Sequence, residues 1–474
     1  MNYKLHSLVA ATLAGSVLMG FGVNAMADST FDLVQALVQK GVLTEEEALP
    51  LMKGRENDIN LADKKVKKAT KLSISDAVDS ATLYGDIRVR YEDRSGSGYS
   101  TFSPAVVDAQ RDRARYKLTL GVKTESGDFY TDLALAMGAN GRSDNATFGK
   151  PAQANIDDKE GLFVKRAMIG WKATDWLTLE AGRMNNPLYT TPMVWDADLN
   201  FEGLAEMVKY KVGDADLFFT AAQAQYQGDR KSYNGVPLVA NNNTVTTELF
   251  AFQGGGKYAF NENASAKAAL TYTNYNHNTG KAAFQPGLNN TTGAALTSVG
   301  YGVNDLDTIE IPAEFNYMVA SNIGMRLFGD YVNNLSGSDR ANAACAASAA
   351  LCGKGDDHTA WMLGLAIGSA KDLKAFEGNK MAKGDWSARI WYQDVGAYAV
   401  DPNAVDSDYM DSRVNMKGTV FKAQYNIQDN VFANLAYGHA TRKNGNLGTG
   451  GAAQDLALNL NNFDLLQLDL TYKF

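Results

Sequence analysis

The sequence predicts an all-β fold: a transmembrane antiparallel β-barrel of about sixteen strands, preceded by a short N-terminal helical periplasmic segment. The last strand supplies the first observation, because apolar and polar residues alternate strictly from Leu466 to Phe474. A period of two indicates a strand whose two faces meet different surroundings. The second observation is an export signal, and the third is that short and long connections alternate. Together they favour lipid outside the barrel and a water-filled lumen inside it.

Residues 1–27 are predicted to be a cleaved signal peptide. Lys4 supplies the positive charge, residues 8–23 form a short apolar stretch, and Ala25, Met26 and Ala27 form an A-x-A cleavage site. Cleavage leaves a mature chain that begins at Asp28. It removes one lysine and no acid, so the net charge changes from −8 to −9. A membrane anchor is the alternative, but the stretch is short of the about 20 residues that span a bilayer.

The composition suits an exported β protein. Glycine is abundant, with 44 residues, whereas the chain has only 9 prolines and 2 cysteines. The mean hydropathy of −0.27 resembles that of a soluble protein. A barrel gives the same average, because polar lumen-facing residues alternate with apolar lipid-facing ones. A net-acidic exported chain is not expected to bind nucleic acid through its charge.

Residues 28–80 form a predicted N-terminal periplasmic segment that differs from the rest of the chain. Apolar residues recur at helical spacing from Phe31 onward. Thr44 and Glu47 have the spacing of a capping box, which predicts a second short helix. A basic run follows at 63–68. Two interpretations stay open for this segment: a solvated linker, or a part that oligomerises or contacts the cell wall.

Residues 81–474 form the predicted barrel domain, in which strand, turn, strand and long loop succeed one another. An even number of strands places both termini in the periplasm. The predicted strands are 82–92, 112–124, 128–139, 161–173, 176–184, 203–212, 215–226, 247–260, 264–276, 306–320, 323–334, 357–370, 385–394, 413–427, 431–441 and 463–474.

The connections alternate in length, as expected when tight turns lie at one barrel end and long loops at the other. Turns such as 126–128 and 213–214 contain Gly and Asp and are short. Loops such as 277–305 and 442–462 are long and polar. The short turns would face the periplasm and the long loops the exterior. The long link 371–384 is the exception to this pattern.

Eleven aromatic residues near predicted strand ends suit the girdles that barrels carry at both membrane interfaces. Any one of them could instead pack on a neighbour, so only the set indicates girdles. They are Trp171, Trp176, Tyr210, Tyr258, Phe260, Tyr317, Tyr331, Trp361, Tyr425, Tyr472 and Phe474.

The two cysteines, Cys345 and Cys352, lie in one predicted external loop. Because an exported protein reaches an oxidising compartment, a small disulfide within this loop is the favoured interpretation. A metal pair is not favoured, since His358 is the only soft ligand nearby. The spacing also differs from that of a C-x-x-C redox motif.

Signals for catalysis or metal binding are poor. The histidines after the signal are His277, His358 and His439, all near predicted external ends, and no nucleophile-elbow, zinc-protease or phosphate-loop motif occurs. Acidic groups at 356–357 and 406–408 could bind calcium, but such loops are usually solvated. The sequence therefore predicts no enzyme activity, no cofactor and no metal site.

Three motifs follow the signal in a characteristic order. They are Gly-Val-Leu-Thr-Glu-Glu-Glu-Ala at 41–48, Ala-Gly-Arg-Met-Asn-Asn-Pro at 181–187 and Val-Trp-Asp-Ala-Asp-Leu-Asn-Phe-Glu-Gly at 194–203. In these motifs the chain resembles a family of Gram-negative putative porins, and the resemblance covers essentially the whole chain. It implies a homotrimer in the outer membrane. It also implies that the third external loop, here residues 184–202, folds into the barrel and narrows it.

Charged residues on the first two predicted strands indicate a basic wall. Arg88 and Arg90 share the polar face of the first strand, and Arg113, Arg115 and Lys117 share that of the second. An Arg or Lys that faces lipid at mid-depth costs about 2–4 kcal/mol, so these side chains must face the lumen or stand above the membrane. Walls of charge inside a pore select solutes by electrostatics.

Acidic residues are available for an opposing wall. Six of them lie in the loop that the resemblance turns inward or at lumen parity on later strands: Asp196, Asp198, Glu202, Glu310, Glu314 and Asp330. Facing walls of opposite charge would set a transverse field that admits polar solutes and disfavours apolar ones. Alternatively, the charges pair with one another and only hydrate the lumen. The clustering of like charges on neighbouring strands favours selection, because it carries a repulsive cost.

The expected function is passive diffusion of small hydrophilic solutes and ions across the outer membrane, with lipid and lipopolysaccharide around the barrel. Two alternatives stay open. One is a substrate-specific channel on the same fold, for which stacked aromatics or a denser basic ladder would be the cue. The other is a structural or adhesive surface barrel plugged by residues 28–80. Ion preference is not predicted, since the mature chain is acidic and the proposed wall is basic.

Overall fold

The computed structural model describes residues 78–100, 105–138, 143–149, 160–230, 232–233, 236–237, 245–277, 305–347, 349–369, 382–449, 455–456 and 458–474. The predicted signal peptide lies outside these residues, as do most of the N-terminal segment and most of the link 371–384. The chain divides into two units, Met1–Asp76 and Ala77–Phe474, and every element given below belongs to the second.

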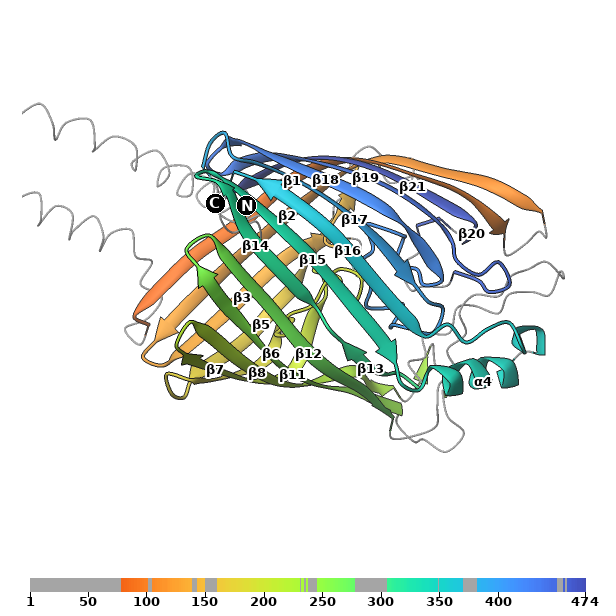
Figure 1. Cartoon of the computed structure of the whole chain (residues 1–474), viewed down its shortest axis with the longest axis horizontal. Helices are drawn as coiled ribbons and strands as arrows, with labels where there is room; N and C mark the ends of the chain where they lie inside the picture. The colour runs from red at the N-terminus through yellow and green to blue at the C-terminus, as the bar shows by residue number, and fades with distance from the viewer. Residues whose placement is uncertain are drawn as a thin grey trace, which may run out of the picture. The chain divides into compact units, whose positions relative to one another are not determined.

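In the described residues the second unit is a closed antiparallel barrel of sixteen strands, because β1 pairs with β21 to complete the ring (Figure 1). At this closure Ile87 lies opposite Tyr472 and Val89 opposite Leu470. The barrel strands, with β13 and β14 forming one of the sixteen, are β1 (Ser80–Ser100), β2 (Val106–Ser126), β3 (Phe129–Gly138), β5 (Gly161–Lys172), β6 (Leu177–Asn185), β7 (Asn200–Val212), β8 (Ala215–Arg230), β11 (Val245–Asn261), β12 (Ala264–His277), β13 (Asp307–Glu310), β14 (Ala313–Ala320), β15 (Ile323–Asn334), β16 (Thr359–Gly368), β17 (Trp386–Val395), β18 (Met416–Gln428), β19 (Val431–Arg442) and β21 (Asn462–Lys473).

The remaining elements are short and lie in the connections. They are the strands β4 (Ala146–Thr147), β9 (Ser232–Tyr233), β10 (Val236–Pro237) and β20 (Leu458–Leu460), the helix α4 (Gly337–Ala347) and the 3₁₀ turn η1 (Ala349–Leu351). In the part of the chain that the structure describes, no helix is long and apolar enough to cross a membrane.

Every predicted strand overlaps a barrel strand, which confirms the predicted fold class and strand number. The predicted strand 306–320 is interrupted, since β13 ends at Glu310 and β14 begins at Ala313. Pro312 explains the break, because proline has no amide hydrogen to donate to the ladder. Neither the helix α4 nor the extension of β1 to Ser100 was predicted. The extension is rich in Ser and Gly, which have low strand propensity, and it gains its ladder by pairing with β20.

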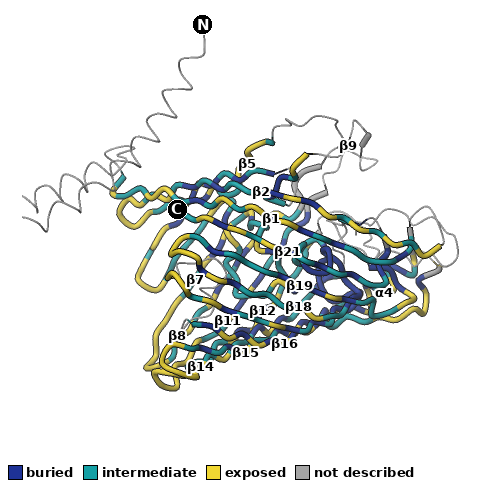
Figure 2. The backbone as a smooth tube through the Cα atoms, turned by 90° about the horizontal axis from the view of Figure 1, so that it is seen from above, coloured by how far each residue is buried: buried dark blue, intermediate teal, exposed yellow. Residues whose placement is uncertain are grey.

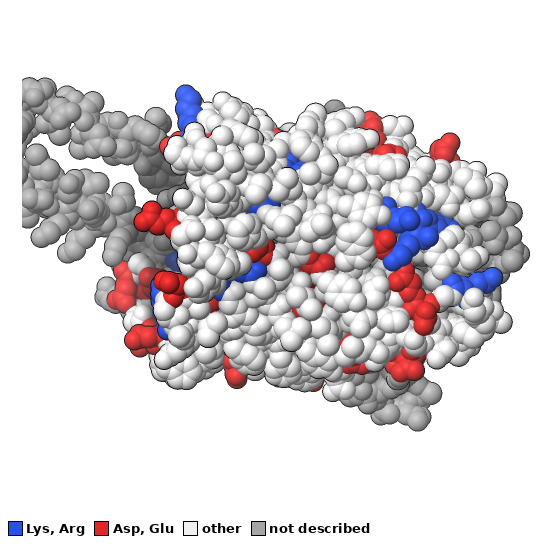
Figure 3. Space-filling view, viewed as in Figure 1, with Lys and Arg blue, Asp and Glu red and all other residues white. Residues whose placement is uncertain are grey.

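Burial follows the predicted alternation of faces. On β1 the apolar Leu83 and Val89 are about half exposed (52% and 48%), whereas the neighbouring Arg90 and Glu92 are 4% and 0% exposed. Figure 2 shows exposed and buried positions along the barrel strands. In Figure 3 the visible barrel wall is mostly uncharged. Apolar side chains outside and polar ones inside are the arrangement that a barrel in lipid requires.

The aromatic residues predicted for the girdles all lie on the outer surface. Their exposed fractions run from 40% for Trp361 to 65% for Tyr210. Two short predicted turns are also present, and each places glycine where the backbone turns left-handed: Gly127 has a φ of 55° and Gly213 a φ of 58°. Other residue types are strained at such angles, so these glycines fix the turn positions.

Four glycines on the inner face lie beneath an aromatic ring of the adjacent strand. A Cβ added to any of them would come within 2.1–2.4 Å of that ring. An aromatic ring that covers a cross-strand glycine compensates for its missing side chain. The pairs are Gly121 with Tyr84, Gly170 with Tyr130, Gly255 with Phe218 and Gly364 with Phe328.

Cys345 and Cys352 are joined by a disulfide between α4 and the residue after η1. The connection that they close also packs a small apolar cluster, in which Ala344 and Leu351 contact Tyr398. The disulfide closes a short loop, with a sequence separation of 7. It therefore stabilises this connection locally.

The double variant Cys345→Ser/Cys352→Ser is expected to be cleaved about tenfold faster by protease within residues 337–355, because the connection opens locally more often. The barrel strands should keep their protease resistance. Limited proteolysis with mass-spectrometric mapping of the cuts measures both effects. Equal cleavage of variant and parent protein would contradict the expectation.

Candidate functional site: the barrel lumen

Residues 186–199, which connect β6 to β7, fold into the barrel and are called the first inward loop. Their inward position agrees with what the porin resemblance implied. The amide of Tyr189 donates to Gln253 Oε1 at 2.8 Å, and Gln253 Nε2 donates back to the Tyr189 carbonyl at 2.8 Å. Gln253 lies on the inner face of β11 and is buried. This reciprocal pair fastens the loop to the wall.

Two buried carboxylates hold the same loop further along. Thr190 donates its hydroxyl to Glu310 at 2.5 Å, and Thr191 donates to Asp330 at 2.5 Å. Both acids are 4% exposed. The sequence predicted Glu310 and Asp330 for an acidic pore wall; the structure places them as anchors of the loop. Glu314, the third acid of that set, accepts a hydrogen bond from the Tyr189 hydroxyl at 3.1 Å.

A second inward loop, residues 396–415 between β17 and β18, was not predicted. Acidic residues 406–408 were expected to be solvated; in the structure they stay partly exposed and line the lumen cavity described below, whereas most of the rest of the loop is buried. Val405, Tyr409 and Met410 pack into the main apolar cluster. These apolar residues, unusual for an exposed polar loop, were the signal that could have revealed it.

The two inward loops are hydrogen-bonded to each other in a junction centred on Asp196. The Asp196 amide donates to the carbonyl of Ala404 at 2.6 Å, and its carboxylate accepts the amide of Ser407 at 3.1 Å. The amide of Asp406 donates to the carbonyl of Pro192 at 3.0 Å. We call this arrangement the loop junction. It makes the two loops one unit that crosses the lumen.

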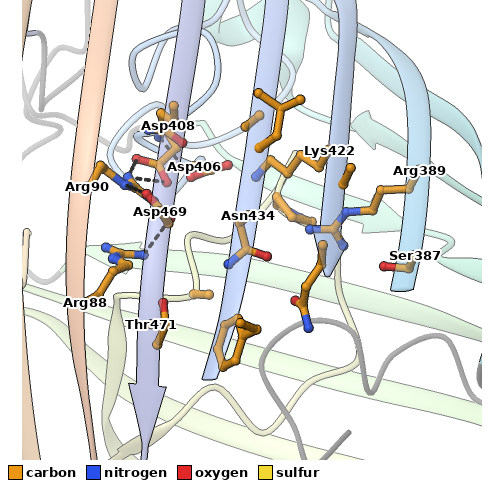
Figure 4. A pocket seen from close by; sticks show the side chains of 18 of the residues that line it. Arg88, Arg90, Ser387, Arg389, Asp406, Asp408, Lys422, Asn434, Asp469 and Thr471 are labelled. Atoms are coloured by element: carbon orange, nitrogen blue, oxygen red, sulfur yellow. Dashed lines mark hydrogen bonds and ion pairs between the residues drawn. The ribbon is translucent and has the colours of Figure 1, made fainter. Parts of the chain in front are cut away.

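Arg90 links the second inward loop to the wall. Its guanidinium donates to both oxygens of Asp469 on β21, at 2.7 and 2.9 Å, and to both oxygens of Asp408, at 2.9 and 3.0 Å (Figure 4). Such two-pronged contacts are among the stronger hydrogen bonds in proteins. Burial would raise the pKa of Asp408, but Arg90, Arg94 and Lys422 hold it well below its ordinary value.

Glu92 is the centre of a buried ion-pair cluster toward the long-loop end of β1 and β2. It is fully buried and lies 2.5 Å from Arg113 and 3.1 Å from Arg94. Arg113 also contacts Asp455 at 2.5 Å. Arg115 lies 3.7 Å from Glu92 and donates to Ser143 at 2.9 Å. In this cluster the positive charges are thus largely paired with Glu92 and Asp455. This matches the alternative in which the lumen charges pair with one another.

A cavity of about 390 Å³ remains between the inward loops and the wall. Figure 4 shows Arg88, Lys422 and Arg389 reaching toward it from β1, β18 and β17. Its charged lining carries seven cations and six carboxylates: Arg88, Arg90, Lys117, Arg326, Arg389, Lys422, Lys473, Asp86, Asp196, Asp198, Asp406, Asp408 and Asp469. Cations lie mainly on the wall, and four of the carboxylates lie on the two loops.

The five residues of the predicted basic wall lie in two different places. Arg88, Arg90 and Lys117 line the cavity. Lys117 lies 3.8 Å from Asp86 on the neighbouring strand. Arg113 and Arg115 lie outside this lining, in the cluster around Glu92.

The three predicted constriction acids also separate. Asp196 forms the loop junction, and Asp198 faces the wall, 3.8 Å from Lys165. Burial opposes ionisation of Asp198, yet Lys117, Lys165 and Arg88 lower its pKa. Glu202 was expected in the loop, but it lies within β7 and is exposed, paired with Arg183 across the β6–β7 ladder. The strand begins at Asn200, earlier than predicted, and its alternation turns Glu202 outward.

In the described residues no group of three or more His, Cys, Asp or Glu side chains is arranged to hold a metal ion. The charges that line the cavity come from its own side chains. Charged groups in a pore act on solutes by electrostatics.

A family model described as "Putative porin" matches residues 97–298 and 284–474. The chain belongs to the putative porin family. Family membership gives this porin a channel role and an outer-membrane location, without specifying its solute. No curated protein sequence matches the chain.

Several solved outer-membrane proteins are similar to this porin. The outer membrane channel DcaP of Acinetobacter baumannii shares 13% identity over 84% of this chain and 99% of that chain, with a TM-score of 0.41. OccD3 (OpdP) of Pseudomonas aeruginosa shares 13% over 84% and 92%, with a TM-score of 0.40. OmpT of Vibrio cholerae shares 10% over 85% and 100%, with a TM-score of 0.42. At these values no residue role is transferred to this porin.

Proposed function

We propose that this porin lets small hydrophilic solutes and ions diffuse passively across the outer membrane. The observation that carries the proposal is the 390 Å³ lumen cavity, lined by ionised side chains of the wall and of both inward loops. Charged linings keep water in a pore and exclude apolar solutes. The resemblance to porins adds a homotrimer, surrounded by lipid and lipopolysaccharide, and an export signal cleaved before Asp28.

The test is to reconstitute the refolded mature protein in a planar bilayer and to record current in a KCl gradient. Stepwise openings, grouped in threes, would support an open trimeric pore, and the sign of the reversal potential would give its ion preference. A silent barrel that still shows a heat-dependent gel mobility would contradict the proposal. Deleting residues 28–80 then distinguishes a plugged barrel, because conductance would appear only after the deletion.

A substrate-specific channel is a second candidate, favoured by the second inward loop and the cations along the wall. The loop fills lumen space with Val405, Tyr409 and Met410, and Arg389 and Lys422 each lie 5.5 Å from the ring of Trp391. Liposome swelling separates the candidates. Flux that rises linearly with solute concentration supports diffusion, whereas saturation supports a specific channel.

Replacing Lys422 with glutamine is expected to lower the anion-to-cation permeability ratio roughly twofold, because it removes a cation from the cavity wall. The reversal potential in a KCl gradient measures this ratio. Lys417→Gln is the matched control, since Lys417 lies on the same strand at opposite parity to Lys422. An equal shift in both variants would show that net charge, rather than lumen position, sets the preference.

A further inference from the structure

A second cavity, of about 780 Å³, lies on the other side of the first inward loop. Residues 187–190 of the loop line it together with β7, β8, β11 and β12. Asp175, in the short turn between β5 and β6, also lines it, so the cavity reaches the short-turn end of the barrel. It shares no lining residue with the 390 Å³ cavity.

The inner end of this second cavity is closed. Tyr189 and Gln253 join loop and wall there through their two hydrogen bonds. Beyond Gln253, the next inward positions of β11 are Ala251 and Leu249, which are 0% and 2% exposed. They pack in an apolar cluster with Phe201. A neighbouring cavity of about 30 Å³ shares Leu188 and Thr190 with it and is lined by Leu249 and Phe201, so the space narrows almost to nothing at this end. We call the 780 Å³ cavity the blind pocket, and it is suited to holding a ligand rather than to conducting one.

The pocket wall concentrates lysines. Lys209, Lys211, Lys257 and Lys267 line it from β7, β11 and β12. Lys257 and Lys267 lie directly opposite each other in the β11–β12 ladder and face the same side. Like charges in this position repel, and the carboxylate of Glu314, opposite Lys267 on the next strand, offsets part of this cost; an anion bound beside Lys257 would offset more.

Carboxylates compensate only part of this charge. Lys211 lies 3.8 Å from Asp216, and both side chains are well exposed to water. Within the described residues, no carboxylate lies within 4.0 Å of the ammonium of Lys209 or Lys257. Glu314 lies directly opposite Lys267 in the β12–β14 ladder and accepts the Tyr189 hydroxyl. The pocket lining thus holds four lysines against three carboxylates, those of Asp175, Asp216 and Glu314, and Lys209 and Lys257 carry the excess of positive charge.

One of the lysines is held in a fixed position by aromatic rings. The ammonium of Lys267 lies 3.7 Å from the centroid of Tyr189 and 5.2 Å from that of Phe218. Contacts of this kind stabilise a cation over a ring face. Lys267 is thus ordered before any ligand arrives, which lowers the entropic cost of binding.

We propose that this blind pocket binds a small anion, recognised through its carboxylate or phosphate group, from the periplasmic side. Lys257 and Lys267 would contact the anionic group, and Lys209 would add charge at the mouth. The binding goes beyond the proposed diffusion function, because the pocket lies apart from the conducting cavity.

Isothermal titration calorimetry on the detergent-solubilised full barrel tests the proposal, with inorganic phosphate and succinate as separate probes. We expect at least one probe to bind, and Lys257→Gln/Lys267→Gln to weaken that binding about tenfold or more. The probe that binds distinguishes a phosphate site from a carboxylate site. Lys209→Gln, which perturbs no ion pair of the described residues, should weaken binding severalfold even if the double variant fails to fold.

Lys383→Gln is the matched control, since Lys383 lies near the end of the long link before β17 and outside the pocket. Unchanged binding by the folded lysine variants would overturn the proposal. Absence of binding of both probes at about 10 mM, a concentration that would reveal even weak binding, would also overturn it. Calorimetry requires no conductance. A conducting pore without binding would refute only this inference, and a silent barrel that binds would refute only the proposed diffusion.

Discussion

Replacing Glu92 with glutamine is expected to lower the free energy of unfolding of the barrel by about 3–5 kcal/mol. Glu92 is fully buried, and its carboxylate lies within 4 Å of four guanidinium groups, those of Arg90, Arg94, Arg113 and Arg115. A neutral amide occupies the same volume but removes the negative charge that compensates them. The measurement is the folded fraction in increasing urea, read from the difference in gel mobility between folded and unfolded barrel.

Glu125→Gln provides the control on the neighbouring strand. Glu125 lies near the opposite end of β2, where its side chain is 59% exposed and 3.9 Å from Lys172. Exposed ion pairs contribute at most about 1 kcal/mol, so this variant should unfold almost like the parent protein. If both variants lost the same small amount, the cluster around Glu92 would be hydrated in solution, and its assigned role in the barrel would be wrong.

The barrel itself could be predicted because its pattern is local. Leu83, Ile87 and Val89 alternate with Asp86 and Arg88 within a few residues, and lipid outside and water inside impose that alternation on every strand. The same reasoning placed the outward aromatics and the tight turns. It failed where partners from far along the chain decide the structure, as in the Ser- and Gly-rich end of β1, and it missed the strand break at Pro312.

The lumen could be predicted only in part, because its contacts join residues that are far apart in sequence. Alternation turns Arg90 inward, where it lines the lumen cavity, but its partner Asp408 lies 318 residues away. The alternation of faces shows that Glu310 and Asp330 point inward. It does not show that Thr190 and Thr191 of a distant loop donate hydrogen bonds to them. A charged residue on a strand can thus be predicted to face the lumen. Whether it lines the pore, forms a buried ion pair or anchors a loop depends on which inward loop contacts it.

Replacing Asp196 with alanine is expected to raise the single-channel conductance about twofold and to increase current noise, because the loop junction then opens. The Asp196 carboxylate accepts the amide of Ser407 from the second inward loop at 3.1 Å and the amide of Asp198 within its own loop at 2.9 Å. A hydrogen bond to a charged group contributes about 1.5–3 kcal/mol, so loss of the Ser407 bond leaves only backbone hydrogen bonds in the junction, and the two inward loops separate more often. Planar-bilayer recordings of parent and variant in symmetrical KCl measure both quantities.

Two further variants distinguish the effect of the loop junction on conductance from the effect of other hydrogen bonds in the first inward loop. Asn186→Ala removes a hydrogen bond within the first inward loop, in which the amide of Leu188 donates to Asn186 Oδ1, and should leave conductance unchanged. Asp196→Asn keeps an oxygen that can accept the Ser407 amide, so it should restore most of the parent behaviour. If Asp196→Asn conducted like Asp196→Ala, the negative charge at the cavity edge would control conductance rather than the link between the loops. If neither Asp196 variant differed from the parent, separation of the two loops would not affect conduction, and the anchors at Glu310 and Asp330 would fix the width of the pore.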